Sequence, residues 1–189
     1  GTVTNALASA FVGSLGGGKS FCNNLIVYYA VLFGGQAVIL DPKSERGNWK
    51  ATLPEIADEI NIVNLTSDER NKGLLDPFVI MRNEKDAESL AIDTLTFLTG
   101  ISSRDGEKFP VLRKAVRSVT QSQTKGLLLV IDELRKEDTS ISRNIADHIE
   151  SFTDYDFAHL LFSDGNVEHA ISLEKQLNII QVADLVLPD

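Results

Sequence analysis

Cysteine and histidine are scarce in this sequence. Its 189 residues contain one cysteine, Cys22, and three widely spaced histidines. An intramolecular disulfide and a zinc site built from several cysteines are therefore excluded, and the histidines form no metal-ligand pattern. A long apolar run is also missing. The longest covers residues 25–33, whereas a membrane-spanning helix needs roughly 20 apolar residues, so we expect a buried helix there. No signal peptide is recognisable at the N-terminus.

An excess of positive charge is absent as well. The formal net charge is −9, which argues against a broad electrostatic grip on nucleic acid and leaves room only for a local basic patch. Any contact with DNA is therefore expected to be indirect or weak. The apolar fraction of 43% and the charged fraction of 24% are ordinary for a globular protein. The length is sufficient for one α/β domain with a sizeable core.

The sequence does contain a phosphate-binding loop at residues 13–20, GSLGGGKS. Its spacing is G-x-x-x-x-G-K-S, in which glycines let successive N–H groups turn inward around phosphates. The lysine is expected to reach the β- and γ-phosphates of ATP, and the serine hydroxyl to bind Mg²⁺. The predicted nucleotide-binding residues are Gly13, Ser14, Leu15, Gly16, Gly17, Gly18, Lys19, Ser20 and Phe21.

The residues around this loop predict a βαβ unit. Residues 8–12 read as a short apolar strand, and residues 19–33 as a helix that is apolar on nearly every face and therefore buried, ended by Gly34 and Gly35. Residues 36–40 read as a second strand, and such continuous apolar strands suggest a parallel sheet covered on both faces.

Further along, the pattern becomes mostly helical. Residues 86–98 and a segment from Pro110 to about Thr120 read as helices, Ser140 is positioned to cap another, and residues 177–182 read as a strand. We therefore expect residues 1–80 to form the βαβ portion of one P-loop domain, residues 81–165 a mostly helical insertion, and residues 166–189 a return to the sheet.

A P-loop ATPase also needs an acidic residue for Mg²⁺, and residues 127–133, LLLVIDE, resemble a Walker B strand that ends in Asp132 and Glu133. Against this, helix-forming residues follow without a turn, and Leu127, Ile131 and Leu134 fall on one helical stripe. We favour a helix, and keep open the alternative in which Asp132 binds the metal and Glu133 is the catalytic base.

Asp41 is a better-placed acid, because it follows the strand that comes after the P-loop helix. It is either a ligand near the Mg²⁺ shell or a cap of the loop that begins at Pro42, and the sequence does not decide between the two.

Several strings together resemble the conjugative transfer ATPases, the large type IV secretion motors, and most closely the ATP-binding proteins of integrative conjugative elements of Gram-positive bacteria. Besides the P-loop these strings are residues 37–45 (AVILDPKSE), 152–157 (FTDYDF) and 177–185 (LNIIQVADL). The resemblance runs along essentially the whole chain.

This resemblance implies a RecA-like parallel sheet flanked by helices, with ATP and Mg²⁺ as cofactors. It also implies a hexameric motor, cytoplasmic and peripheral at the inner face of the cell membrane, that works with membrane-embedded channel components. In that family the Walker B strand and the arginine finger would follow Asp189, so the chain is expected to be an incomplete motor domain that hydrolyses ATP poorly by itself. Two alternatives remain: a self-sufficient ATPase or kinase using Asp132 and Glu133, and a module that binds nucleotide without hydrolysis.

Overall fold

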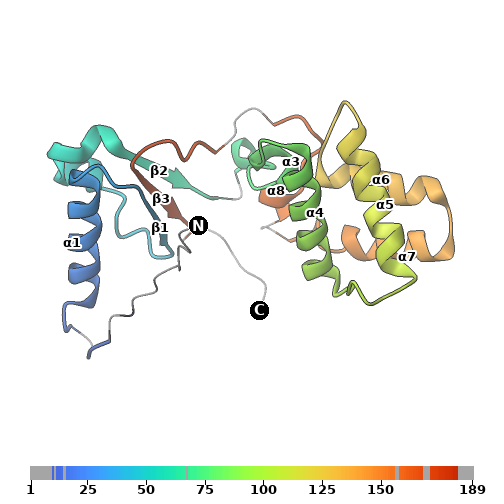
Figure 1. The fold of residues 1–189 in the computed structure, drawn as a ribbon, viewed down its shortest axis with the longest axis horizontal. Coiled ribbons are helices and arrows are strands. Elements are labelled where there is room, and N and C mark those ends of the chain that lie inside the picture. Colours follow the sequence, from blue (N-terminus) through green and yellow to red (C-terminus); the bar gives the residue numbers. More distant parts are fainter. Residues whose placement is uncertain are drawn as a thin grey trace, which may run out of the picture.

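A computed structural model of the chain describes residues 10, 12–14, 16–66, 68–155, 158–167 and 171–182. Figure 1 shows a sheet with one long helix at one end of the molecule and a group of helices at the other. In chain order the elements are α1 (Lys19–Leu32), β1 (Ala37–Asp41), α2 (Trp49–Thr52), η1 (Pro54–Glu59), β2 (Ile60–Asn64), η2 (Glu69–Asn71), α3 (Pro77–Ile80), α4 (Glu84–Thr99), α5 (Lys108–Gln121), α6 (Leu127–Glu137), α7 (Ser140–Glu150), α8 (Ala158–Leu161) and β3 (Leu177–Gln181).

Within the described residues the sheet has three parallel strands in the order β1-β3-β2. Leu177 of β3 is in register with Ala37 on one side and with Ile60 on the other. The central strand therefore comes last in the sequence, and the helical segment leaves the sheet after β2 and returns to it at β3. The strands expected at residues 36–40 and 177–182 are confirmed, whereas the one expected at residues 8–12 lies largely outside the described residues.

Helix α1 packs on one face of the sheet, where Val31 meets the buried side chains of Ile39 and Ile179. The expectation that α1 is buried all round is wrong, because Val31 is its only fully buried residue. The other side of the helix has no described element against it, so Ile26 is 52% and Phe33 83% exposed. Coverage of both faces of the sheet is likewise not observed along β1, where Leu40 is 73% exposed on the face opposite Ile39.

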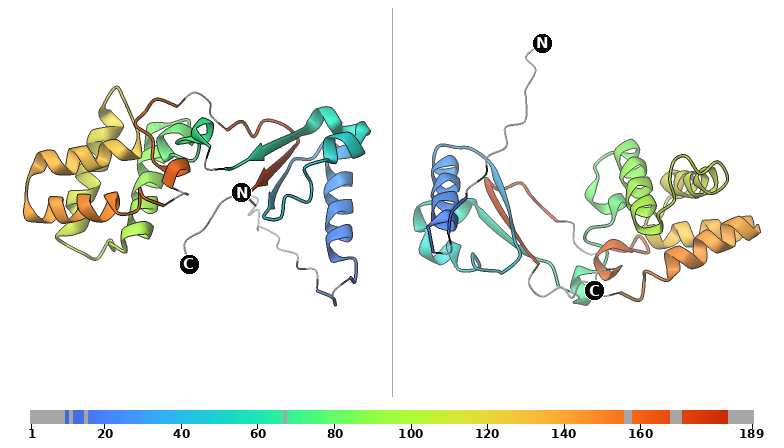
Figure 2. Two further views of the ribbon diagram at one scale, coloured as in Figure 1. Left: turned by 180° about the vertical axis from the view of Figure 1, so that it is seen from behind. Right: turned by 90° about the horizontal axis from the view of Figure 1, so that it is seen from below.

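A second core lies among helices α4 to α7, which pack against one another as Figures 1 and 2 show. Leu95 of α4, Leu112 of α5 and Ile145 of α7 are completely or almost completely buried there. Helix α7 is capped by Thr139, which exchanges hydrogen bonds with Ser142 in a capping box. The N-cap is therefore Thr139, one residue before the predicted Ser140.

Helix α6 confirms that residues 127–136 are helical and do not form a Walker B strand. Its buried residues Leu127, Val130, Ile131 and Leu134 recur at the spacing of one helical face. The start of α6 is fixed by Asp76, a fully buried residue that caps α3 and also accepts a hydrogen bond of 2.8 Å from the Leu127 amide.

Candidate functional site: the phosphate loop and the adjoining strand ends

The predicted phosphate loop precedes α1 directly, and α1 begins at Lys19. Gly16 and Gly18 both have φ of +77°, a left-handed conformation that L side chains rarely adopt. A Cβ atom at either position would meet no atom within 4 Å, so backbone conformation rather than lack of space demands glycine there. The Gly17 amide closes the turn by donating to the Ser14 carbonyl at 3.1 Å. Leu15 lies outside the described residues.

The side chain of Lys19 folds back over this loop. Its Nζ donates to the carbonyl oxygens of Gly13 and Ser14, each at 2.7 Å. The ammonium group is therefore held beside the loop by two neutral acceptors and by no described carboxylate. A phosphate oxygen is a stronger, charge-assisted acceptor than a carbonyl and is able to take their place.

The first turn of α1 presents backbone donors to the same place. Cys22 is the first residue whose amide bonds into the helix, to the Gly18 carbonyl at 2.9 Å. The amides of Lys19, Ser20 and Phe21 have no backbone acceptor within the described part of the chain, as expected for a helix N-terminus. These donors, the partial positive charge of the helix end and the nearby ammonium fit the phosphates of a nucleotide. Ser20 is exposed in this turn, where its hydroxyl is accessible to a metal ion bound with those phosphates.

Asp41 lies at the carboxyl end of β1 and is 1% exposed. Its Oδ1 accepts from Arg46 Nη1 at 3.0 Å, and its Oδ2 from the Arg46 amide at 2.9 Å and from Gln181 Nε2 at 3.4 Å. Through the bond from the Arg46 amide, Asp41 caps the loop that begins at Pro42. Both carboxylate oxygens are engaged, so a role of Asp41 at Mg²⁺ stays a prediction that requires Arg46 to release it.

The environment of Asp41 favours its charged form. Burial raises the pKa of this carboxyl, but the hydrogen bonds from the Arg46 amide and the Gln181 side chain, together with the Arg46 charge, outweigh burial and hold the pKa below its ordinary value. Asp41 is therefore an ionised, paired carboxylate at neutral pH.

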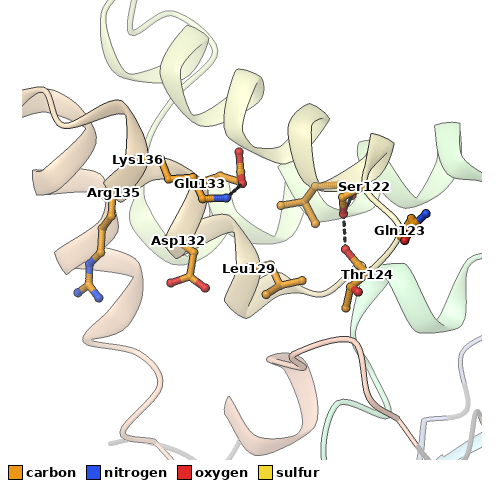
Figure 3. A pocket seen from close by; sticks show the side chains of 9 residues that line it. Ser122, Gln123, Thr124, Leu129, Asp132, Glu133, Arg135 and Lys136 are labelled. Carbon is orange, nitrogen blue, oxygen red and sulfur yellow. Dashed lines mark hydrogen bonds and ion pairs between the residues drawn. The ribbon is translucent and has the colours of Figure 1, made fainter.

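Asp132 and Glu133 are not brought to the phosphate loop. Both lie on α6, in the helical group at the opposite end of the molecule from α1 (Figures 1 and 2). Figure 3 shows them lining a shallow groove with Lys136 and Ser122. Glu133 accepts hydrogen bonds from Lys136 and from the Ser118 hydroxyl, and these bonds lower the pKa of Glu133. A general base is most effective with a pKa near neutrality, so this environment favours a surface ion pair.

None of the helices formed by the described residues has the length and apolar character needed to cross a membrane. The same part of the chain contains no cluster of three or more histidine, cysteine, aspartate or glutamate side chains arranged to hold a metal ion.

Residues 1–189, the whole chain, match the family model described as the AAA-like domain. The chain belongs to this AAA-like family. Membership implies nucleotide binding, which agrees with the geometry of the phosphate loop.

Two known proteins are similar to this AAA-like domain. The uncharacterized protein YddE of Bacillus subtilis (strain 168) is 23% identical over 206 residues, which cover 100% of this chain and 24% of YddE. The solved structure of VirB4 of Thermoanaerobacter pseudethanolicus aligns with a TM-score of 0.61 at 15% identity, over 88% of this chain and 47% of that one. The structural likeness shows an α/β P-loop fold. The domain spans about a quarter of YddE and about half of the VirB4 chain.

Three residues bonded in a cluster around Asp41 were not predicted from the sequence: Arg46, Asn24 and Gln181. Arg46 donates through Nε and Nη2 to the Asn24 side chain of α1, at 3.1 and 2.9 Å, and its guanidinium lies 5.6 Å from the centre of the Trp49 ring. Gln181 ends β3. Asn24 and Gln181 are polar residues in largely apolar elements, but Asn23 of α1 and Asn178 of β3 are polar as well, so polarity alone did not single them out. The pairing with Arg46 joins residues 22 positions apart and left no local pattern.

Proposed function

We propose that this AAA-like domain is the ATP-binding portion of a motor ATPase that powers conjugative transfer of DNA or protein through a type IV secretion system. The observation that carries the proposal is the position of Lys19, which sits on the N-terminal turn of α1 with its ammonium directed back over a glycine loop. The strings shared with conjugative transfer ATPases and the fold shared with VirB4 support the assignment to this class of motor.

In this proposal each part of the loop has a separate task. The amides of residues 18–21 bind the phosphate oxygens, and Lys19 exchanges its two carbonyl acceptors for them. The Ser20 hydroxyl and, after release by Arg46, the Asp41 carboxylate hold Mg²⁺. The bound Mg²⁺–ATP supplies the phosphoryl group whose transfer to water powers the motor.

The wider assembly is part of the same proposal. The parent protein forms a homo-oligomer, a hexamer in the working state, lies in the cytoplasm at the inner face of the membrane, and works with the membrane-embedded channel. Contact with DNA is indirect or weak, consistent with the net charge of −9.

The first experiment measures nucleotide affinity. The chain and its Lys19→Ala variant are titrated with a fluorescent ATP analogue in the presence of Mg²⁺, with Lys85→Ala as the matched control because Lys85 is an exposed lysine on α4. We expect affinity to fall at least about 10-fold for Lys19→Ala, since a charge-assisted bond is worth about 1.5 kcal/mol or more, and to be unchanged for Lys85→Ala. Equal affinity for all three proteins contradicts ATP binding by this loop.

The second experiment tests the motor. Lys19→Ala is introduced into the full-length protein in donor cells, and the frequency of conjugative transfer is measured at matched protein levels. We expect transfer to be lost. Normal transfer by the variant contradicts a role as the motor, even if the isolated domain binds ATP.

A further inference from the structure

An apolar groove adjoins the phosphate loop. It has a volume of about 320 Å³ and lies between one face of α1 and the segment of α2 and Leu53. Its α1 side is formed by Phe21, Asn24, Leu25 and Tyr28, which recur at the three- and four-residue spacing of a single helical face.

The groove and the phosphate loop share a residue. Phe21 follows Ser20 directly, so its amide belongs to the donor set at the helix end while its ring lines the groove. Leu25, one turn later, lies about 6 Å further along the helix axis. A group in this groove is therefore separated from phosphates at the helix end by roughly the size of a ribose.

The lining of the groove includes three aromatic side chains and the polar side chains of Asn24 and Thr52. The Phe21 side chain is 71% exposed, and Tyr28 and Trp49 are half-buried members of the core between α1 and the sheet. The Oδ1 atom of Asn24 is held by Arg46, which fixes the orientation of the amide. Its Nδ2 atom donates to no acceptor within the described part of the chain, and Asn24 lies in the lining of a groove formed mostly by aromatic and aliphatic side chains.

We propose that this groove binds the purine base of the nucleotide whose phosphates occupy residues 13–20, an inference that rests on the proposed function. A purine presents flat faces that stack on aromatic side chains and ring nitrogens that accept from an amide N–H. Continuity with the phosphate loop favours a nucleotide base over other apolar occupants. Asn24 is then a specificity-determining residue, and its bond to Arg46 couples base binding to the Asp41 cluster.

Trp49 makes the test direct, because it is the single tryptophan of the chain. The 189-residue chain is titrated with ADP and, separately, with pyrophosphate, by calorimetry and by tryptophan fluorescence. We expect ADP to bind more tightly than pyrophosphate by roughly 5- to 150-fold, the range found for base–aromatic stacking, and ADP alone to change the emission of Trp49.

Variants separate the contribution of the base to binding from that of the phosphates. Phe21→Ala is expected to lower the affinity for ADP and leave the affinity for pyrophosphate unchanged, whereas Lys19→Ala lowers both affinities. Phe97→Ala, at an 87% exposed phenylalanine of α4, is the matched control and should alter neither. Trp49→Phe should keep most of the ADP affinity and lose the fluorescence signal.

The outcomes distinguish the two proposals. If ADP and pyrophosphate bind equally and depend on Lys19, the phosphate site stands and the base site is overturned. If neither binds, both proposals fall. If Phe21→Ala leaves the affinity for ADP unchanged but alters the sedimentation of the chain, the groove is a contact between protein surfaces and the base site is again overturned.

Discussion

Arg46 and Asn24 are joined by two hydrogen bonds from one guanidinium to one amide oxygen, at 3.1 and 2.9 Å. The same guanidinium bonds Asp41 at 3.0 Å. One side chain thus ties the helix that begins at Lys19 to the carboxyl end of β1. Movement of α1 relative to the sheet requires these bonds to break, so Arg46 is positioned to link the phosphate loop with the strand ends.

The first prediction concerns this link. Arg46→Lys keeps the charge but lacks the planar fork needed to bond Asn24 and Asp41 together. We expect a loss of about 1–3 kcal/mol in the free energy of unfolding, because the lysine ammonium cannot keep the bonds to both Asn24 and the Asp41 carboxylate, which is 1% exposed. Urea unfolding measures it. Arg143→Lys is the control, since its ion pair with Asp138 is exposed and is expected to change stability by less than about 0.5 kcal/mol. Equal effects of the two substitutions would contradict the link.

The second prediction concerns pH. The pKa of Asp41 is lowered in the folded chain, so its charged form stabilises the fold at pH values above the ordinary pKa of 3.8, and this contribution is lost as the pH falls through the folded pKa. Wild type should therefore be more stable than Asp41→Asn at pH 7, and the difference should shrink below pH 3.8. Denaturant unfolding at several pH values measures the difference, and a gap independent of pH would show that Asp41 acts through its shape alone.

The third prediction concerns the junction between the sheet and the helices. Both the amide and the hydroxyl of Ser163 donate to Asp76 Oδ2, at 3.0 and 2.8 Å, beside the bond from the Leu127 amide. Asp76→Ala leaves these buried donors without an acceptor and should cost about 2–4 kcal/mol of unfolding free energy. Thermal and urea unfolding measure it against Asp93→Ala, an exposed aspartate of α4 expected to change stability by less than about 0.5 kcal/mol. A small effect of Asp76→Ala would mean that water replaces the carboxylate.

The sequence predicted the elements whose signals are local. The loop before Lys19, strands β1 and β3, and helix α6 all follow from short patterns, and α6 was separated from a Walker B strand by the stripe of Leu127, Ile131 and Leu134. An aliphatic run before Asp132 is compatible with a strand or a helix. The helical spacing of Leu127, Ile131 and Leu134 favoured the helix.

Burial and pairing were not predictable in the same way. Helix α1 has an apolar composition on nearly every face, yet only Val31 is fully buried, because burial depends on which elements lie beside a helix. The bond from Leu127 to Asp76 joins residues 51 positions apart, and no local pattern indicates such a contact. For the same reason no local pattern predicted the cluster around Asp41, whose members are distant in the sequence.

The fourth prediction separates the two candidate sets of carboxylates. The double variant Asp132→Asn, Glu133→Gln should leave nucleotide affinity unchanged, because both residues lie on α6 away from α1. In the full-length protein it should also leave ATP hydrolysis unchanged, whereas Lys19→Ala should abolish it. Phosphate release and ATP-analogue titration measure these effects. Loss of hydrolysis with normal folding and binding in the double variant would restore Asp132 and Glu133 as catalytic candidates.

The last prediction is that the 189-residue chain binds ATP but hydrolyses it poorly. Binding needs the loop amides, Lys19 and the helix N-terminus, all of which the chain contains. Turnover also needs a metal-binding carboxylate, a group that positions water, and an arginine that is worth roughly 10³–10⁵ in rate in related enzymes. Asp41 is occupied by Arg46, Asp132 and Glu133 lie elsewhere, and the chain spans 47% of the VirB4 chain that it resembles.

The measurement is phosphate release by the 189-residue chain beside the full-length parent protein, each with its Lys19→Ala variant to subtract contaminating activity. We expect Lys19-dependent release from the full-length protein and little or none from the chain alone, although both bind the fluorescent ATP analogue. Robust, Lys19-dependent turnover by the chain alone would show that its own side chains complete the site. Because Asp41 is the acid at the strand ends, Asp41→Asn would then be the decisive variant: it would abolish that turnover if Arg46 releases the carboxylate to the metal, and spare it if Asp41 is only a loop cap.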